Sequence, residues 1–542
     1  MALPDVHARA PARIVDPLVA ILLFVVVVLV FRPLTSGGFF VDDFVRLYDL
    51  ANYGLTKLLL SPHGGHMYIA SNGVYAVFWR MFGLAPHRWL AAVIVLHALN
   101  AAIFFGVLRR FGCRPLAAGT IAALWALCPV QAGAVGWMAV FGHVLLGTIM
   151  LAWLNEVAGI ATSGVSVSGW KLARCWTLGL LAAMSFAIGI GLCIVLPAAA
   201  SLLLPAAAAR RRVCSVLASL WVIVPTIYVV QHALYARWYS VTSFMTPGMT
   251  IPSDIGDLVR RMGEAGWLML AFLVYGAGVL SLGSPAMAPP ADWLGPVAGP
   301  DVVLLWLSIP AALLAGLAGW ALSHSQPPRR SLATGFLLLA AAAYGAVAFG
   351  AVASARVELE ARFLGWTAAR TVADIVTIPR YHYVATLFLG GVLAVAAEAS
   401  ASRSAGWARA TRAVLIVVLA SLGMRVRWDG DTLARLRTWN EFSGLTRQLE
   451  DDVARWKNGN TVYLPNDAIG SGFLALHVDS FPGRAGLCVI THPTGVLGGK
   501  TVRFIESDPL LLAVLRAQID TPIAQLVVAP DEVPRPCGDE PP

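Results

Sequence analysis

The sequence predicts an all-α polytopic membrane protein with about 11 transmembrane helices, followed by a small C-terminal α/β domain. Of its 542 residues, 58% are hydrophobic and only 13% are charged, whereas soluble domains carry roughly 25% charged residues. Apolar runs long enough to cross a bilayer recur along the chain. Arg residues cluster at the ends of these runs, as in cytoplasmic loops. The net charge of +9 therefore indicates membrane topology rather than nucleic acid binding.

The individual spans follow from the requirement of about 20 consecutive apolar residues. The first run is too long for a signal peptide and lacks a small-residue cleavage site, so we expect it to be a span. The predicted spans are 15–34, 89–108, 116–134, 137–155, 171–187, 189–207, 213–234, 302–322, 331–353, 381–398 and 409–424.

A further apolar stretch, 264–284, has an ambiguous role because it is Gly-rich and precedes a loop-like Pro- and Gly-rich segment. If it crosses the membrane, the basic clusters at 329–330 and 403–412 fall outside. If it lies in the interface or re-enters, every basic cluster falls inside, as the distribution of Arg and Lys favours. We therefore expect 264–284 not to cross, with the N-terminus inside and the C-terminus outside.

This topology predicts a membrane domain over residues 1–425 with external loops 35–88, 235–301 and 354–380. Residues 426–542 form the second predicted domain, on the external side. Its size of roughly 110 residues is that of an independent domain.

The C-terminal domain is predicted as α/β from its short apolar runs. The segments TVYLP, LCVITH, TVRFIE and AQLVVAP are typical of strands, and 431–456 is typical of a helix. Cys488 and Cys537 both lie in this domain, and they could pair if it is outside the cytoplasm. The Cys residues of the membrane domain are expected to be small buried apolar side chains.

An acidic pair follows the first span, in the stretch FFVDDFVRLYDL. Asp42 and Asp43 could simply begin a solvated helix, since acids suit the positive helix end. Alternatively, one of them is a general base, because apolar surroundings and a neighbouring like charge raise a carboxyl pKa. On a helix the two side chains point about 100° apart, so one could face a cavity while the other holds a partner.

The stretch SPHGGHMY carries His63 and His66 in the same external loop. A spacing of three could place both rings on one side of a helical turn and bind a metal. The intervening glycines indicate a loop instead, so polar lining of an external cavity is the favoured interpretation. No metal or other cofactor is predicted, and a divalent metal has no further support.

The stretch TIPRYHYV places Arg380, Tyr381 and Tyr383 at the external end of a late span. Interfacial Tyr residues are ordinary, and the two tyrosines are candidates to line the cavity. Arg at an external end is less expected, and its planar donors can hold a phosphate. Arg370 and Arg237 are further phosphate candidates on external loops. Snorkelling to ordinary lipid phosphates is the alternative for all three.

Two other external arginines, Arg260 and Arg261, are secondary phosphate candidates. No Walker loop, GxGxxG after a strand or HExxH motif occurs in the chain. The acids and arginines on the outer face instead suit group transfer from a lipid-phosphate donor.

Taken together, these features resemble the GT-C superfamily of polytopic glycosyltransferases. The resemblance is strongest to the bacterial relatives of protein O-mannosyltransferases and of tetratricopeptide-containing O-mannosyltransferases. The resemblance rests on the acidic pair after the first span and on three later stretches. These are FWRMFGLAPHRWLAAVIVLHALNAAIFFGVLRRFG, LWALCPVQAGAVGWMAVFGHVLLGTI and PRYHYV. Together they cover most of residues 15–400, and their order and spacing are more specific than any one of them.

The resemblance implies an inverting transferase that takes a sugar from a polyprenyl-phosphate donor. It assigns acceptor activation to Asp42, with Asp43 as second choice, and the donor phosphate to Arg380. The acceptor implied is an envelope glycan, a lipid or a protein, with the active site on the periplasmic side of a bacterial inner membrane. The chain has Gly133 where the family has Glu, and Phe141 where it has Arg. The S-K-E stretch of the family reads Ser185, Phe186 and Ala187 here.

Two alternatives remain open. A transporter or flippase of a lipid-linked glycan would use the same anion-binding residues without chemistry. Such proteins place ionisable groups at mid-membrane depth and show paired halves, which this sequence does not. A lapsed paralogue that binds or assembles without turnover is the other alternative, indicated by Gly133 and Phe141.

Overall fold

The computed structural model describes residues 15–39, 42–62, 66–83, 85–163, 167–239, 253–282, 300–353, 368–425, 461–465 and 501–505. The first half contains α1 (Val15–Phe31), η1 (Arg32–Ser36), α2 (Asp42–Leu60), α3 (Ile69–Phe82), α4 (Pro86–Arg110), α5 (Pro115–Ala126), η3 (Pro129–Gln131), α6 (Ala132–Val135), η4 (Met138–Val140), α7 (Gly142–Ser163), α8 (Gly169–Ser185), α9 (Ala187–Leu203), α10 (Ala207–Ala218) and α11 (Leu220–Tyr239).

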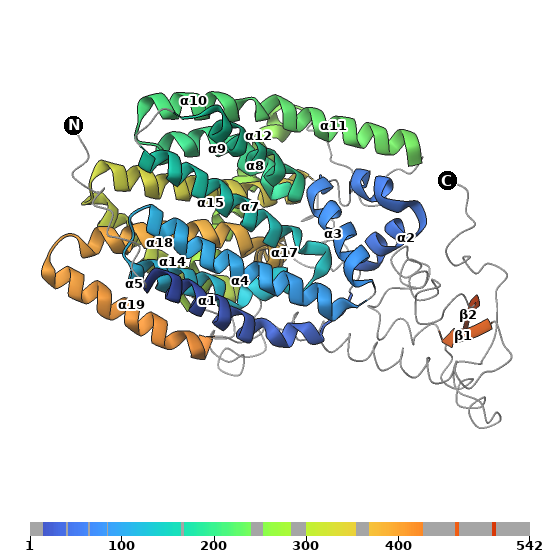
Figure 1. The fold of residues 1–542 in the computed structure, drawn as a ribbon, viewed down its shortest axis with the longest axis horizontal. Helices are drawn as coiled ribbons and strands as arrows, with labels where there is room; N and C mark the ends of the chain where they lie inside the picture. Colours follow the sequence, from blue (N-terminus) through green and yellow to red (C-terminus); the bar gives the residue numbers. More distant parts are fainter. Residues whose placement is uncertain are drawn as a thin grey trace, which may run out of the picture.

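The second half contains α12 (Ile255–Leu282), α14 (Pro300–Ser323), α15 (Pro327–Ala353), α17 (Ala368–Thr377), η6 (Pro379–His382), α18 (Tyr383–Ala401), α19 (Ala405–Arg425), β1 (Thr461–Pro465) and β2 (Thr501–Ile505). The long helices run side by side along the long axis, and α2 and α3 lie at one end of the bundle (Figure 1). We call this end the α2 end.

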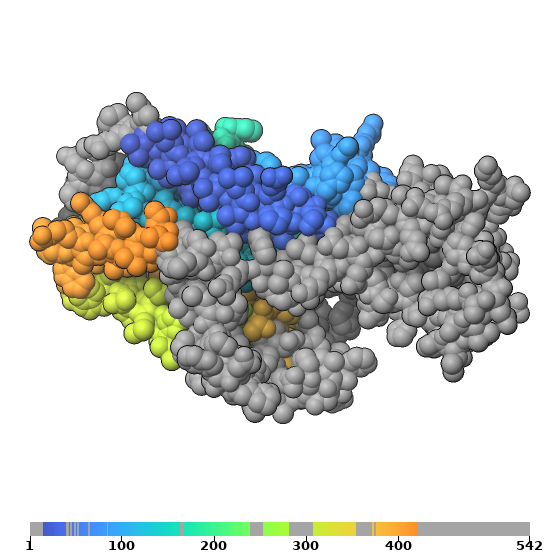
Figure 2. All heavy atoms as spheres, turned by 90° about the horizontal axis from the view of Figure 1, so that it is seen from below, coloured from blue at the N-terminus to red at the C-terminus, as the bar shows by residue number. Residues whose placement is uncertain are grey.

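The prediction of a multi-pass helical membrane protein is confirmed. Among the described residues, seven helices are long and apolar enough to cross a membrane, or eight if one bent pair counts as a span. Large apolar side chains such as Leu22 of α1 and Val222 of α11 are exposed, as expected for surfaces that face lipid. Figure 2 shows α1, α14 and α19 on one such face. The larger predicted number, about 11 spans, stays a prediction.

The predicted span 116–134 falls on a bent pair of helical segments, which together are long and apolar enough to count as one span. The helix α5 ends at Ala126, and the chain continues through η3 and α6 at an angle of 50°. Pro129 begins the new segment, and proline cannot donate the backbone hydrogen bond that would continue α5. Gln131 Nε2 donates to Trp125 O over 3.1 Å and so satisfies a carbonyl near the end of α5. The next predicted span, 137–155, falls on a candidate span that begins at Met138 with η4 and continues through α7.

Residues 264–282 of this stretch belong to one continuous helix, α12, so the external segment 235–301 is not simply a loop. The helix packs closely on α14, since a Cβ at Gly278 would lie 2.6 Å from Leu307 O. Its length and composition suffice to cross a membrane. The expectation that 264–284 does not cross the membrane therefore stays a prediction.

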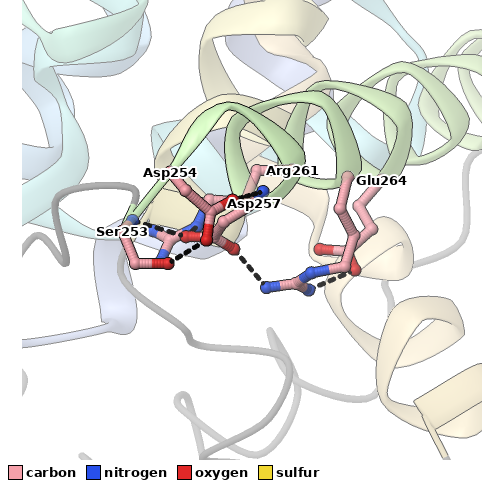
Figure 3. Close-up of polar contacts among 6 residues, drawn as sticks. Ser253, Asp254, Asp257, Arg261 and Glu264 are labelled. Atoms are coloured by element: carbon pink, nitrogen blue, oxygen red, sulfur yellow. Dashed lines mark hydrogen bonds and ion pairs between the residues drawn. The ribbon is translucent and has the colours of Figure 1, made fainter.

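The start of α12 is held by local polar contacts (Figure 3). The Asp257 amide donates to Asp254 Oδ1 over 2.8 Å, which caps the helix. Arg260 forms ion pairs with Asp257 and Glu264, and Arg261 forms one with Asp257. These contacts engage both arginines that the sequence suggested as secondary phosphate ligands.

The centre of the bundle is built around Tyr383, the first residue of α18. Its side chain is fully buried, and its hydroxyl contacts His97 Nδ1 at 2.7 Å and Asn100 Nδ2 at 3.1 Å. Gly147 makes room for the ring, because a Cβ there would lie 2.8 Å from Tyr383 Cε1. The interpretation of Tyr383 as a cavity residue is therefore wrong: the side chain joins α4 and α18 in the core.

Basic residues from distant loops meet at the bundle end that we call the basic end. Arg110, Arg210 and Arg329 line one cavity there, although they come from three different helix connections. This convergence is what the predicted arrangement of basic clusters on one side requires.

The strands β1 and β2 pair in parallel, with Thr461 opposite Thr501 and Pro465 opposite Ile505. Two predicted strand segments, TVYLP and the first five residues of TVRFIE, are thereby confirmed. The other two predicted strands, the helix 431–456, Cys488 and Cys537 lie outside the described residues. The α/β domain as a whole remains a prediction.

Candidate functional site

The predicted external loop 35–88 contains a pair of packed helices. Tyr75 on α3 donates its hydroxyl proton to the Asp43 carbonyl over 3.0 Å, and Asn72 Nδ2 donates to Leu58 O over 2.6 Å. The backbone turns at Gly54, whose φ of +75° lies in the region that glycine adopts without strain. The turn divides α2 into two parts, and both parts pack against α3.

Asp43 and Arg46 lie on the same side of α2, since residues three apart are neighbours on a helix. Both are buried, with 0% and 2% of their surface exposed. The Arg46 guanidinium lies over two rings, 4.7 Å from the centroid of Tyr68 and 5.7 Å from that of Tyr75. Cation–π contacts of this kind stabilise a cation without supplying an acceptor for its protons.

Arg46 carries an unsatisfied donor set. Its Nε and Nη1 atoms are buried and have no hydrogen-bond partner among the described residues. A buried donor without an acceptor is unfavourable by about 1–3 kcal/mol, more for a charged group. An incoming anion that accepts hydrogen bonds from these two atoms would therefore bind at Arg46 with a substantial gain in free energy.

His66 lies next to this arginine. Its ring stacks on Phe186 with centroids 5.7 Å apart and meets Tyr68 edge-on at 5.6 Å. Burial and, to a smaller extent, the positive charge of Arg46 lower the pKa of His66 from 6.5 to about 4. The imidazole is therefore neutral at pH 7, so one ring nitrogen can accept a hydrogen bond.

A second histidine, His143, is fully buried at the start of α7. Neither of its ring nitrogens has a hydrogen-bond partner among the described residues. Its ring centroid lies 3.8 Å from that of Phe186 and 6.3 Å from that of Tyr381. Sequence patterns gave no reason to single out this residue, because an isolated His in an apolar run is usually a core residue.

Arg380 lies in η6, directly before α18. Its guanidinium lies over the rings of Trp137, at 4.9 Å, and Tyr381, at 5.1 Å. The η6 backbone is seated against Gly133, where a Cβ would lie 2.5 Å from Pro379 Cβ and 2.9 Å from Arg380 N. Gly133 therefore sets the position of Arg380, which explains why no larger residue stands there.

A row of rings connects the two arginines. Arg46 contacts Tyr68, which lies 5.2 Å from Phe186. Phe186 then contacts His143, and His143 lies beside Tyr381, the ring next to Arg380. We call the set Asp43, Arg46, His66, His143 and Arg380 the α2-end cluster. It contains two cations, one carboxylate and two histidines, on four separate segments of the chain.

The remaining candidates stand apart from this cluster or cannot be placed. Arg237 is exposed near the end of α11. Asp42 and Arg370 belong to α2 and α17, but their side chains, like all of His63, lie outside the described residues. Tyr381 is partly buried between Arg380 and His143.

Two further features bear on the chemistry of the site. Phe141 is fully buried against Phe78, with ring centroids 5.8 Å apart, so its position is filled by packing. Within the described residues, no group of three or more His, Cys, Asp and Glu side chains is arranged to hold a metal ion. The cluster combines anion-binding donors with a carboxylate that can accept a proton.

Comparison with known proteins leaves this geometry as the main basis for interpretation. No model of a known protein family matches the chain, and no curated protein matches it. Among solved structures, ArnT from Cupriavidus metallidurans, bound to undecaprenyl phosphate, aligns over 92% of this chain and 95% of its own. The identity is 16% and the TM-score 0.34. Similarity at that level carries no argument about fold or function.

Proposed function

We propose that this protein is an inverting membrane glycosyltransferase that moves a sugar from a polyprenyl-phosphate donor to an acceptor on the side of the α2 end. The observation that carries the proposal is the buried Arg46, whose Nε and Nη1 donors lack acceptors among the described residues, on the same side of α2 as the buried Asp43. An anion and a proton acceptor are the two requirements of transfer from a lipid phosphate.

In the proposed reaction, Asp43 or Asp42 accepts a proton from an acceptor hydroxyl or amine. The freed electron pair attacks the anomeric carbon as the bond from that carbon to the phosphate oxygen breaks. A single displacement inverts the anomeric carbon and leaves the polyprenyl phosphate with the bonding electrons. Arg46 and Arg380 would stabilise the negative charge that grows on the phosphate, so little acid assistance is needed.

In this proposal the α2 end faces the periplasm of a bacterial inner membrane, together with the C-terminal domain. The acceptor is an envelope glycan, a lipid or a protein. Arg370 and Arg237 remain secondary candidates for the phosphate, and His63, His66 and Tyr381 remain candidates for the cavity wall.

A binding function without transfer, as in a flippase or assembly factor, is favoured by one observation. The positions where the family pattern has Glu and Arg are filled by packing in this chain, with Gly133 against Pro379 and Phe141 against Phe78. The same experiment separates transfer from binding.

The test offers radiolabelled polyprenyl-phosphate sugars to purified protein in nanodiscs and follows sugar consumption and donor binding. Native protein is compared with Asp42→Asn, Asp43→Asn and the double variant. Asp16→Asn serves as a control, because Asp16 pairs with Arg109 in a different part of the bundle. Loss of transfer with retained binding in an α2 variant supports the mechanism. Full transfer by the double variant rules it out, and donor binding without transfer by native protein favours the binding function.

A further inference from the structure

The cavity at the basic end has no role in the proposed reaction. It has a volume of about 420 Å³ and is lined by the connections α4–α5, α9–α10 and α14–α15. This volume lies within the range of small-ligand sites. The wall combines apolar side chains, among them Leu203, Leu332 and Val395, with the cationic side chains of Arg110, Arg210 and Arg329.

The arginines of this cavity differ from their neighbours in how they are paired. Arg109 forms an ion pair with Asp16, and Arg114 forms one with Glu398. In the described part of the chain, neither Arg110 nor Arg210 has a carboxylate partner, although both line the cavity.

Arg329, the third cation, is satisfied by neutral groups. Its Nη1 atom donates to Ser402 Oγ over 2.5 Å and points toward the Glu398 carbonyl at 3.4 Å. The acid that lines the cavity, Glu398, receives both the backbone amide and the Nε atom of Arg114, each at 3.1 Å. The carboxylate is therefore already neutralised from outside the cavity, and the cavity retains a net positive charge.

We propose that this cavity binds the phosphate headgroup of an anionic phospholipid. Arg110 and Arg210, which have no carboxylate partner among the described residues, would hold the phosphate oxygens, and the leucine and valine side chains would contact the glycerol and the start of the acyl chains. The apolar wall favours a lipid over free phosphate, because inorganic phosphate has no apolar groups that could be buried against it. The site is separate from the α2-end cluster, so the proposal does not depend on the proposed transferase activity.

The experiment is native mass spectrometry of the purified full chain in detergent, titrated with phosphatidylglycerol, phosphatidylcholine or inorganic phosphate. Native protein should retain phosphatidylglycerol preferentially. The double variant Arg110→Gln/Arg210→Gln should bind it roughly thirtyfold more weakly. Each arginine near an anionic headgroup contributes about 1 kcal/mol to binding, and the loss of two such contributions corresponds to roughly thirtyfold in affinity.

The matched control is Arg211→Gln/Arg330→Gln. It removes the same charge from the neighbouring positions, which do not line the cavity. Equal weakening in both double variants would show general surface attraction and overturn the proposal, as would unchanged binding in the first variant. If millimolar inorganic phosphate displaced bound phosphatidylglycerol as effectively as added phosphatidylglycerol does, the assignment of the ligand as a lipid would be overturned. Gel filtration checks that both variants remain folded.

Discussion

The two groups of arginines in this bundle are stabilised in different ways. Arg109 and Arg114 each lie 3.1 Å from a carboxylate oxygen, of Asp16 and Glu398. Arg46 and Arg380, in the α2-end cluster, rest on aromatic rings, and Arg46 keeps two buried donor atoms without an acceptor among the described residues. Ion pairs fasten helices together, whereas an unsatisfied buried cation is ready to receive an anion.

This difference teaches how to separate structural from functional arginines in a membrane bundle. The positive residues outnumber the acids in this chain, 39 to 30, so abundance alone cannot mark a site. What distinguishes Arg46 is that two of its buried donor atoms, Nε and Nη1, have no acceptor among the described residues, a state that is unfavourable until a ligand arrives. Five predictions test the comparison, from the largest expected effect to the smallest.

The largest effect is expected for Arg46→Gln. Transfer from a polyprenyl-phosphate sugar should fall by roughly 10²-fold or more, because the charge that stabilises the leaving phosphate is lost. The midpoint of thermal unfolding should stay unchanged or rise, since an unsatisfied buried cation is removed. A fall in the midpoint with transfer intact would mean that Arg46 is structural and would remove the contrast between the two groups.

Gly133→Val should reduce the free energy of unfolding by about 3 kcal/mol or displace η6, because the new side chain would collide with Pro379 and the Arg380 backbone. Thermal unfolding in detergent measures the effect. Gly106→Ala is the control, since a Cβ there meets no atom within 4 Å. Equal stability of the two variants would show that η6 is not held by this contact.

His143→Phe should stabilise the fold by about 1–2 kcal/mol, since two buried ring nitrogens that lack partners among the described residues are replaced by carbon. Transfer should fall at the same time if the imidazole contacts a ligand. The variant is measured by thermal unfolding and by the transfer assay. A destabilised variant would indicate that His143 has a polar partner in the folded protein.

The pH dependence of stability should carry a contribution from His66. Its folded-state pKa is about 4 against an ordinary value of 6.5, so between these values the unfolded chain binds a proton that the folded protein does not. Stability is therefore lost as the pH falls from 6.5 to 4, by up to about 1 kcal/mol per pH unit. Thermal unfolding of native protein and of His66→Gln, measured from about pH 4.5 to about pH 7.5, should show a shallower dependence of stability on pH for the variant. Identical slopes would contradict this assignment.

The smallest effect is expected for Arg114→Gln. The Arg114 side chain is 48% exposed, and an ion pair with one exposed partner contributes about 0.5–1 kcal/mol. The midpoint of thermal unfolding should drop slightly, and transfer should not change. A large loss of transfer would show that charges outside the α2-end cluster also control the reaction.

The helical framework was largely predictable because it depends on local composition. Runs such as 15–34 and 89–108 are largely apolar, and each falls on helical segments of the structure. The break after Ala126 could have been read from Pro129, whose missing amide proton ends a helix. The continuous helix α12 was harder to predict, since glycines weaken a helix locally while packing against α14 stabilises it.

The site was only partly predictable. The acidic pair and Arg380 stood out because charge is rare next to an apolar run, but Arg46 and His143 did not. What makes those two residues candidates is that buried nitrogen atoms of their side chains have no hydrogen-bond partner among the described residues, and that depends on what surrounds each side chain. Tyr383 illustrates the opposite case, since a residue in a motif with Arg380 turned out to be a core residue bonded to α4.

The sequence by itself therefore determined the class of the molecule, the positions of most helices and the grouping of basic loops, because hydropathy and charge act locally along the chain. Only the tertiary structure decided which charged side chains are paired and which remain unsatisfied. The partners of Arg46, Arg110 and Arg114 come from segments far apart in the sequence, or are absent among the described residues, and no local pattern encodes that distinction.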